Sequence, residues 1–110
     1  MGTDKPRILF MGTPDFAVPS LELLVEKSWP VIGVVTQPDR PKGRGQRLVA
    51  SPVKEAAARH GLTVHQPEKV RAPEFLETFR TLAPEMVVLV AFGQILPKEI
   101  IDGPPLGCVN

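Results

Sequence analysis

The feature that most constrains the fold of this chain is a regular alternation of short apolar runs with segments of helical periodicity. Continuous apolar runs of this length are typical of strands buried on both faces of a sheet. Five runs are predicted to be strands: residues 7–11, 31–35, 62–65, 86–91 and 108–110. Strict alternation of strand and helix predicts a parallel sheet with helices on both faces, because right-handed crossovers place them there. We therefore expect an α/β fold in which residues 1–110 belong to a single domain.

Prolines and capping residues delimit the four helices between these strands. Ser51 is a favourable N-cap directly before Pro52, which suits the first helical position, and Gly61 suits the position after the last turn. The other three helices are predicted from Val18 to before Pro30, from Pro73 to before Pro84, and from Pro97 to Ile101. Their apolar residues recur at the spacing of one buried face.

A binding crevice is expected where the order of the strands reverses, at the carboxyl ends of the strands. If the order is third, second, first, fourth, the turn at residues 12–16 and the loop at residues 92–97 face each other across that crevice. The pattern alone does not assign a ligand. Gly12 lacks the GxGxxG spacing of a dinucleotide site, and Gly93 is equally typical of an ordinary strand end.

The connection after the second strand is unusually long and basic. It takes about fourteen residues, 37–50, where such connections usually take two to six. Four cations against one acid leave this loop with a net charge of +3, while the rest of the chain carries −2. The five charged residues are Asp39, Arg40, Lys42, Arg44 and Arg47. A basic loop on an acidic body indicates a phosphate or polyanion partner, and a solvated surface loop is the alternative.

Composition excludes several classes of protein. With 43% hydrophobic and 23% charged residues, the 110-residue chain suits one globular domain. No apolar run approaches the roughly 18 residues of a membrane span, and residues 1–10 lack the apolar segment of a signal peptide. One cysteine, Cys108, and two widely spaced histidines form no metal-ligand pattern. We expect a cytoplasmic protein without a metal or a membrane partner.

Five segments are more specific than a generic α/β domain requires: FMGTPDFAVPSLELL, VVTQPDRPKGRGQRL, SPVKEAA, VAFGQILPKEII and PPLGCVN. In this order, from about Arg7 to Asn110, they resemble the N-terminal part of the methionyl-tRNA formyltransferase family. The resemblance implies a Rossmann-like parallel sheet in a truncated formyltransferase domain. It also implies an activity in translation initiation, the transfer of a formyl group from 10-formyltetrahydrofolate to the methionine amino group of initiator methionyl-tRNA.

The resemblance assigns one catalytic residue to this chain. In the family, an Asn, a His two residues later and a more distant Asp carry the chemistry, and Asn110 matches that Asn. Its amide would stabilise the negative oxygen that develops when the amine attacks the formyl carbon. Neither His60 nor His65 matches the family's His. We therefore expect this chain, as a fragment of the enzyme, to be inactive by itself.

The resemblance also assigns two sets of binding residues. The set that receives the pterin of 10-formyltetrahydrofolate is Phe92, Gly93, Gln94, Ile95, Leu96 and Pro97. The set that contacts the acceptor end of the tRNA is Gly12, Thr13, Pro14, Phe16, Arg40, Lys42, Gly43, Arg44, Gly45 and Arg47. Arg44 matches the family's most important basic residue, and its flanking glycines let the backbone approach a ribose-phosphate chain. The family implies no metal, and a monomer for the full-length enzyme.

Two alternatives remain open at this point. One is another folate-dependent formyltransferase of the same fold, such as a sugar-nucleotide formyltransferase, although such an enzyme has no need of the DRPKGRG loop. The other is a non-enzymatic RNA-binding α/β module, which has no use for the GQILP segment. For Cys108 we expect a structural role as a small buried residue.

Overall fold

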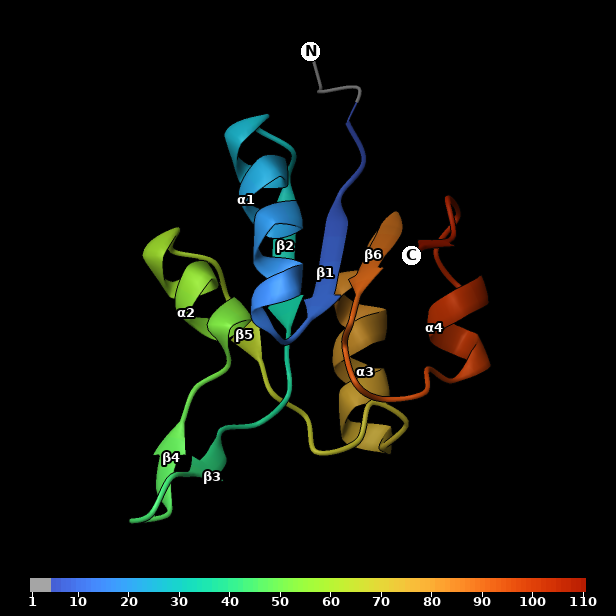
Figure 1. Ribbon diagram of the computed structural model, residues 1–110. Coiled ribbons are helices and arrows are strands. Elements are labelled where there is room, and N and C mark those ends of the chain that lie inside the picture. The colour runs from blue at the N-terminus through green and yellow to red at the C-terminus, as the bar shows by residue number, and fades with distance from the viewer. Residues whose placement is uncertain (1–4) are drawn as a thin grey trace.

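The computed structural model describes residues 5–110. Residues 1–4, which belong to the stretch without a signal-peptide pattern, lie outside the described residues. The chain forms a five-stranded sheet in the order β5-β2-β1-β6-β7 (Figure 1), and all of its pairings are parallel. The strands are β1 (Ile8–Gly12), β2 (Val31–Val35), β5 (Val64–His65), β6 (Met86–Val90) and β7 (Cys108–Val109). The α/β fold and the five strands are therefore confirmed, and the order assumed for the first four of them is the observed one.

The helices begin and end close to the predicted residues. They are the 3₁₀ turn η1 (Asp15–Ala17), α1 (Val18–Glu26), α2 (Pro52–Arg59), α3 (Pro73–Leu82) and α4 (Lys98–Asp102). Ser51 caps α2, because its hydroxyl accepts a hydrogen bond from the Lys54 backbone nitrogen over 3.0 Å. Gly61 has the positive φ of +67° that suits a residue after the last helical turn. The first helix ends earlier than predicted, at Glu26.

The helices cover the two faces of the sheet and enclose one core on each side. On one face, Leu21 of α1 and Ala56 of α2 pack with Phe10 of β1. On the other face, Phe79 of α3 and Ile100 of α4 pack in the cluster that contains Met11. Neighbouring β1 residues point to opposite faces, so the continuous apolar run supplies both cores at once.

The structure corrects the prediction for residues 37–50. This connection contains an antiparallel ribbon of two strands, β3 (Arg40–Lys42) and β4 (Arg47–Val49), which projects away from the main sheet (Figure 1). Gly43, with a φ of +77°, lies in the turn between the strands. Every residue of both strands is exposed, so neither face needs apolar side chains. The sequence consequently lacked the alternation by which strands are predicted.

Candidate functional site

Three segments that are distant in the sequence meet at the carboxyl ends of β1, β2 and β6. Thr13 follows β1, and its Oγ1 donates to the backbone oxygen of Phe92, which lies just beyond β6, over 2.7 Å. The backbone nitrogen of Gln37, which lies just beyond β2, donates to the same Oγ1 over 3.4 Å. The predicted proximity of the first turn and the 92–97 loop is therefore confirmed.

The first turn is packed at its start and open after it. A Cβ on Gly12 would lie only 2.7 Å from the backbone oxygen of Val90 and 2.9 Å from the Cβ of Ala17. Gly12 therefore serves close packing of the strand against its neighbours. Pro14 is exposed and Phe16 is 78% exposed. Of the tRNA-binding residues predicted in this turn, Pro14 and Phe16 are the accessible ones.

The loop at residues 92–97 presents few side chains to solvent. Phe92 is 2% exposed and belongs to the core beneath α3 and α4, and Leu96 packs against the same core. Pro97 is the residue directly before α4. Ile95, in contrast, is 94% exposed. The loop thus offers a ligand its backbone and the side chain of Ile95, while the ring of Phe92 stabilises the fold.

The side chain of Gln94 is fully engaged with the protein. Its Oε1 accepts a hydrogen bond from the Val70 nitrogen over 2.8 Å. Its Nε2 donates to the backbone oxygen of Glu68 over 3.0 Å and to Oε1 of Gln37 over 2.9 Å. Gln94 therefore ties the loop to the segment before α3 and to the segment after β2.

A groove separates the first turn from the base of the basic ribbon. Its volume is about 350 Å³. Its lining comprises Thr13, Pro14, Asp15, Gln37, Pro38, Arg40, Pro41, Lys42, Val49, Ala50, Ser51 and Pro52. The groove therefore brings residues from the first turn together with two cations of the ribbon, which are the two segments assigned to tRNA in the sequence analysis.

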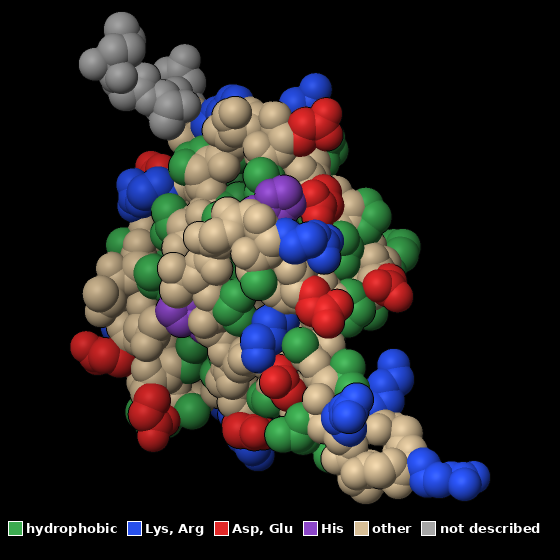
Figure 2. Space-filling view, turned by 90° about the vertical axis from the view of Figure 1, so that its left-hand side faces the viewer, with side chains coloured by type: hydrophobic (Ala, Val, Ile, Leu, Met, Phe, Trp, Pro, Cys, Tyr) green, Lys and Arg blue, Asp and Glu red, His purple; other side chains and the backbone are tan. Residues whose placement is uncertain are grey.

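The ribbon carries the accessible positive charge of this region. Arg40, Lys42, Arg44 and Arg47 are all exposed, and no ion pair joins any of them to another residue in the part of the chain that the structure describes. Figure 2 shows Lys and Arg side chains gathered on the arm that projects from the body. Such cations are available to phosphate groups without first breaking an internal bond.

The base of the ribbon is anchored on both sides. On one side, the Asp39 carboxylate accepts bonds from Lys54 Nζ over 3.1 and 3.2 Å and from Gln66 Nε2 over 2.8 Å. These bonds, first of all the one from Gln66, hold the pKa of Asp39 below its ordinary value. On the other side, the hydroxyls of Thr36 and Ser51 lie 2.6 Å apart in the interior. Hydrogen bonds therefore hold the base of the ribbon, and its tip is exposed.

Asn110 lies at the far edge of the sheet. It is exposed and directly follows β7. The pairing of Val88 with Val109 puts Asn110 beside Leu89, just before the end of β6. The predicted catalytic amide is therefore near the same end of the sheet as the 92–97 loop, because β6 and β7 are parallel.

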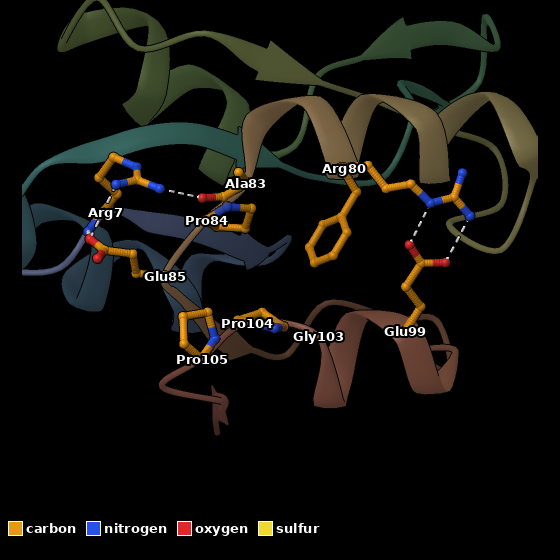
Figure 3. A pocket seen from close by; sticks show the side chains of 10 residues that line it. Arg7, Arg80, Ala83, Pro84, Glu85, Glu99, Gly103, Pro104 and Pro105 are labelled. Atoms are coloured by element: carbon orange, nitrogen blue, oxygen red, sulfur yellow. Dashed lines mark hydrogen bonds and ion pairs between the residues drawn. The ribbon is translucent and has the colours of Figure 1, made fainter.

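A larger pocket of about 480 Å³ lies at the opposite end of the sheet, between α3 and α4 (Figure 3). Its two arginines are already paired. Arg7 donates to the backbone oxygen of Ala83 and lies 3.5 Å from the Glu85 carboxylate. Arg80 makes two hydrogen bonds to Glu99, of 2.7 and 3.0 Å. This pocket therefore offers no unpaired charged group for chemistry, and the site is assigned to the carboxyl ends of the strands.

Sequence reasoning missed the residues that hold this site together. These residues are polar and come from four segments: just beyond β2 (Gln37), the base of the ribbon (Asp39), α2 (Lys54) and just beyond β5 (Gln66). Gln66 directly follows β5, and Gln37 lies two residues after β2. A polar residue just after a predicted strand is a signal that could have placed them at this edge. Their pairing with one another depends on the fold and leaves no pattern in the sequence.

Within residues 5–110 there is no cluster of three or more His, Cys, Asp or Glu side chains suited to holding a metal ion. None of the helices described has the length and apolar character needed to cross a membrane.

A family model and several similar proteins match this chain, and they agree with one another. A family model described as formyl transferase matches residues 6–110. Proteins named methionyl-tRNA formyltransferase from Trichlorobacter lovleyi and Bacillus subtilis are each 60% identical to the chain over 104 residues, which is 94% of this chain and 33% of theirs. The protein of that name from Syntrophus aciditrophicus is 58% identical over 106 residues, 96% of this chain and 34% of its own. The chain thus spans about one third of the length of these relatives.

Proposed function

The chain belongs to the formyl transferase family, and on this premise we propose that its protein is a methionyl-tRNA formyltransferase. The proposed reaction moves the formyl group of 10-formyltetrahydrofolate to the methionine amino group of initiator methionyl-tRNA. The observation that carries the proposal is the exposed basic ribbon standing beside the crevice. A folate enzyme acting on a small acceptor has no need of such an arm, whereas a tRNA acceptor end needs cations outside the crevice.

The tRNA side of the proposal rests on the ribbon and the first turn. Arg44 lies at the tip of the ribbon between Gly43 and Gly45, where nothing within 4 Å obstructs either glycine. Its guanidinium can approach a phosphate or a base edge with two donors at once. The groove between Pro14 and the ribbon would then hold the end of the acceptor strand. The remaining cations of the ribbon contribute affinity without reading sequence.

The folate side rests on the 92–97 loop. The folate supplies the formyl group, and the loop would hold its pterin ring. Exposed backbone at Gly93 and the apolar side chain of Ile95 suit a flat ring whose edge carries donors and acceptors. The pterin ring would thus contact the backbone of the loop and the side chain of Ile95, since Phe92 and Leu96 pack in the core.

For the chemical step, this chain contributes Asn110. Its side-chain amide would donate to the formyl oxygen as negative charge develops there. The amine loses a proton when its bond to the formyl carbon forms, and the departing folate nitrogen gains one. The His and Asp that handle these protons in the resembling family have no counterpart within residues 1–110. A cytoplasmic, monomeric enzyme without a metal remains our expectation.

Formyl transfer from 10-formyltetrahydrofolate to methionyl initiator tRNA tests the proposal directly. Two proteins are compared: the 110-residue chain, and the same chain joined after Asn110 to the downstream part of the B. subtilis relative, referred to below as the extended protein. We expect formylation by the extended protein and none by the 110-residue chain. Replacement of Asn110 by Ala in the extended protein should abolish most of the activity.

Each other outcome is informative. If the authentic B. subtilis protein formylates and the extended protein does not, while both are folded, this chain does not support the reaction and RNA binding alone becomes the better proposal. Formylation by the 110-residue chain would instead show that the assignment of the missing His and Asp is wrong.

A further inference from the structure

Gln37 lies where the two proposed substrate sites meet. It follows β2 and precedes the base of the ribbon, and it is half-buried. The 92–97 loop, proposed to bind the folate, lies on its other side. Because the chain passes from Gln37 into Pro38 and Asp39, a displacement of Gln37 is carried directly into the base of the ribbon.

The side chain of Gln37 binds the loop with both of its polar atoms. Its Nε2 donates to the backbone oxygen of Gly93 over 3.1 Å. Its Oε1 accepts from Gln94 Nε2 over 2.9 Å. A glutamine side chain has one acceptor group and one donor group, and both are directed here at the same loop.

The backbone of Gln37 binds the rest of the site. Its nitrogen donates to Thr13 Oγ1 over 3.4 Å, and its oxygen accepts from Gln66 Nε2 over 3.3 Å. Gln66 in turn donates to Asp39 at the base of the ribbon over 2.8 Å. One residue thus connects the first turn, the ribbon base and the segment beyond β5 to the 92–97 loop.

Close packing adds to these hydrogen bonds. A Cβ on Gly93 would lie 2.8 Å from Nε2 of Gln37, and the φ of Gly93 is +106°, which side chains rarely adopt. The loop at Gly93 therefore lies in close contact with the end of the Gln37 side chain. A shift of the Gly93 backbone therefore acts directly on the hydrogen bond that Gln37 donates to it.

We propose that Gln37 is a positioning residue that couples the folate site to the tRNA site, so that each substrate binds more tightly when the other is bound. The inference rests on the proposed function. A ligand that orders the 92–97 loop fixes Gln37, and a fixed Gln37 holds the ribbon in one position before the tRNA arrives. Such coupling is reciprocal, so both substrates must show the same factor.

The test measures the dissociation constant of methionyl initiator tRNA with and without 5-formyltetrahydrofolate, a stable formylated folate, and the reverse pair. Both are measured on the extended protein. We expect each ligand to strengthen binding of the other by about 5-fold or more, the lower end of typical coupling. In the Gln37→Met variant, which keeps a side chain of similar length but has no amide, the factor should fall to nearly 1.

A second variant and a control keep the result interpretable. Gln37→Glu keeps the acceptor for Gln94 but places an oxygen against the Gly93 oxygen, so coupling should also be lost. Thr81→Ala, an exposed change on α3, should leave the coupling as in the unmodified protein. For each variant, circular dichroism before binding shows whether it is folded.

The outcomes separate this inference from the proposed function. Binding of both ligands with no coupling, or coupling that persists in both folded Gln37 variants, would overturn the inference alone. Binding of neither ligand by the unmodified protein would overturn the proposed function and the inference together. Equal weakening of both single-ligand affinities with the coupling factor unchanged would show that Gln37 is merely structural.

Discussion

Asp39 illustrates how one side chain positions others that bind substrate. Its carboxylate receives Lys54 from α2 and Gln66 from the segment beyond β5, and it stands just before the first cation of the ribbon. The residue has no proposed contact with tRNA. Asp39 would therefore affect the reaction indirectly, by holding the ribbon in position.

Replacement of Asp39 by Ala in the extended protein should raise the KM for tRNA several-fold and leave kcat at saturating tRNA nearly unchanged. The reason is that the loosened ribbon weakens binding while the reacting groups stay in place. Steady-state formylation kinetics measure both constants. Asp102→Ala, which breaks an exposed ion pair with Lys98 on α4, is the matched control and should change neither. A fall in kcat with an unchanged KM would contradict this role for Asp39.

The burial of His65 should make the stability of the fold depend on pH. Its Nε2 is buried and has no hydrogen-bond partner, and burial lowers the pKa of the ring from its ordinary value of 6.5. The unfolded chain therefore takes up a proton at a higher pH than the folded chain does. Above about pH 6.5 the ring is neutral in both states, and the free energy of unfolding is not reduced by His65. As the pH falls from there toward the lowered pKa, the unfolded chain binds the proton first, and the free energy of unfolding decreases.

Urea unfolding at pH 7.5 and at pH 5.5 tests this prediction. The unmodified chain should lose more unfolding free energy between the two pH values than the His65→Leu variant loses. Glu22, whose pKa is lowered chiefly by its hydrogen bond to His60, titrates below this window and does not confuse the comparison. Equal losses in the two proteins would show that His65 is protonated in the folded state without cost.

At the scale of elements, the basic ribbon is the part of the chain that distinguishes this molecule from a plain α/β domain. Among residues 5–110, β3 and β4 pair with each other and with no other strand, and all of their residues are exposed. Their stability depends on the anchored base rather than on a core. The charge of the ribbon is thus presented on an element that the rest of the fold leaves accessible.

The salt dependence of tRNA binding should report the charges of this ribbon. Each cation that contacts a phosphate releases counterions, so Arg44→Ala should reduce the slope of log affinity against log salt by roughly 0.7 to 1. Binding titrations at several salt concentrations measure the slope. Arg80→Ala, at the opposite end of the molecule and paired with Glu99, is the control and should leave the slope unchanged. An unaltered slope for Arg44→Ala would place the tRNA elsewhere.

At the scale of the whole molecule, the strands of the sheet differ in how deeply they are buried. β1 is buried throughout, whereas β6 is buried at Val87 alone and half-buried at its other positions. β7 pairs with Val87 and Val88 only, within the described part of the chain. Three exposed apolar residues, Ile101, Leu106 and Val109, lie on this side of the fold. Apolar surface and unpaired backbone of this kind favour association between chains.

We therefore expect the 110-residue chain to self-associate at high concentration and the extended protein to do so less. Size-exclusion chromatography with light scattering over a range of concentrations measures the difference. Val109→Lys, which places a charge on the exposed edge strand, should reduce the association of the 110-residue chain. If that chain is monomeric at all concentrations and the variant behaves identically, this edge is already protected.

The sequence by itself determined the five strands of the main sheet, the four helices and the family. Apolar runs and caps act between residues close in the chain, as Ser51 and Gly61 show. The strand order was an assumption that the structure bore out for the first four strands. The family assignment rested on long specific motifs and agrees with the matching family model. The roles of the individual site residues, Asn110 included, remain predictions.

Only the tertiary structure decided what surrounds the site. The two strands of the ribbon could not be predicted from the sequence, because exposed strands carry no alternation of apolar and polar residues. Phe92 is buried in a core built from several elements. The bonds of Gln37 to Gly93 and Gln94 join residues 56 and 57 positions apart. Contacts over such distances depend on how the strands are brought side by side. No local pattern encodes them, because the free energy that forms them comes from packing of the whole fold.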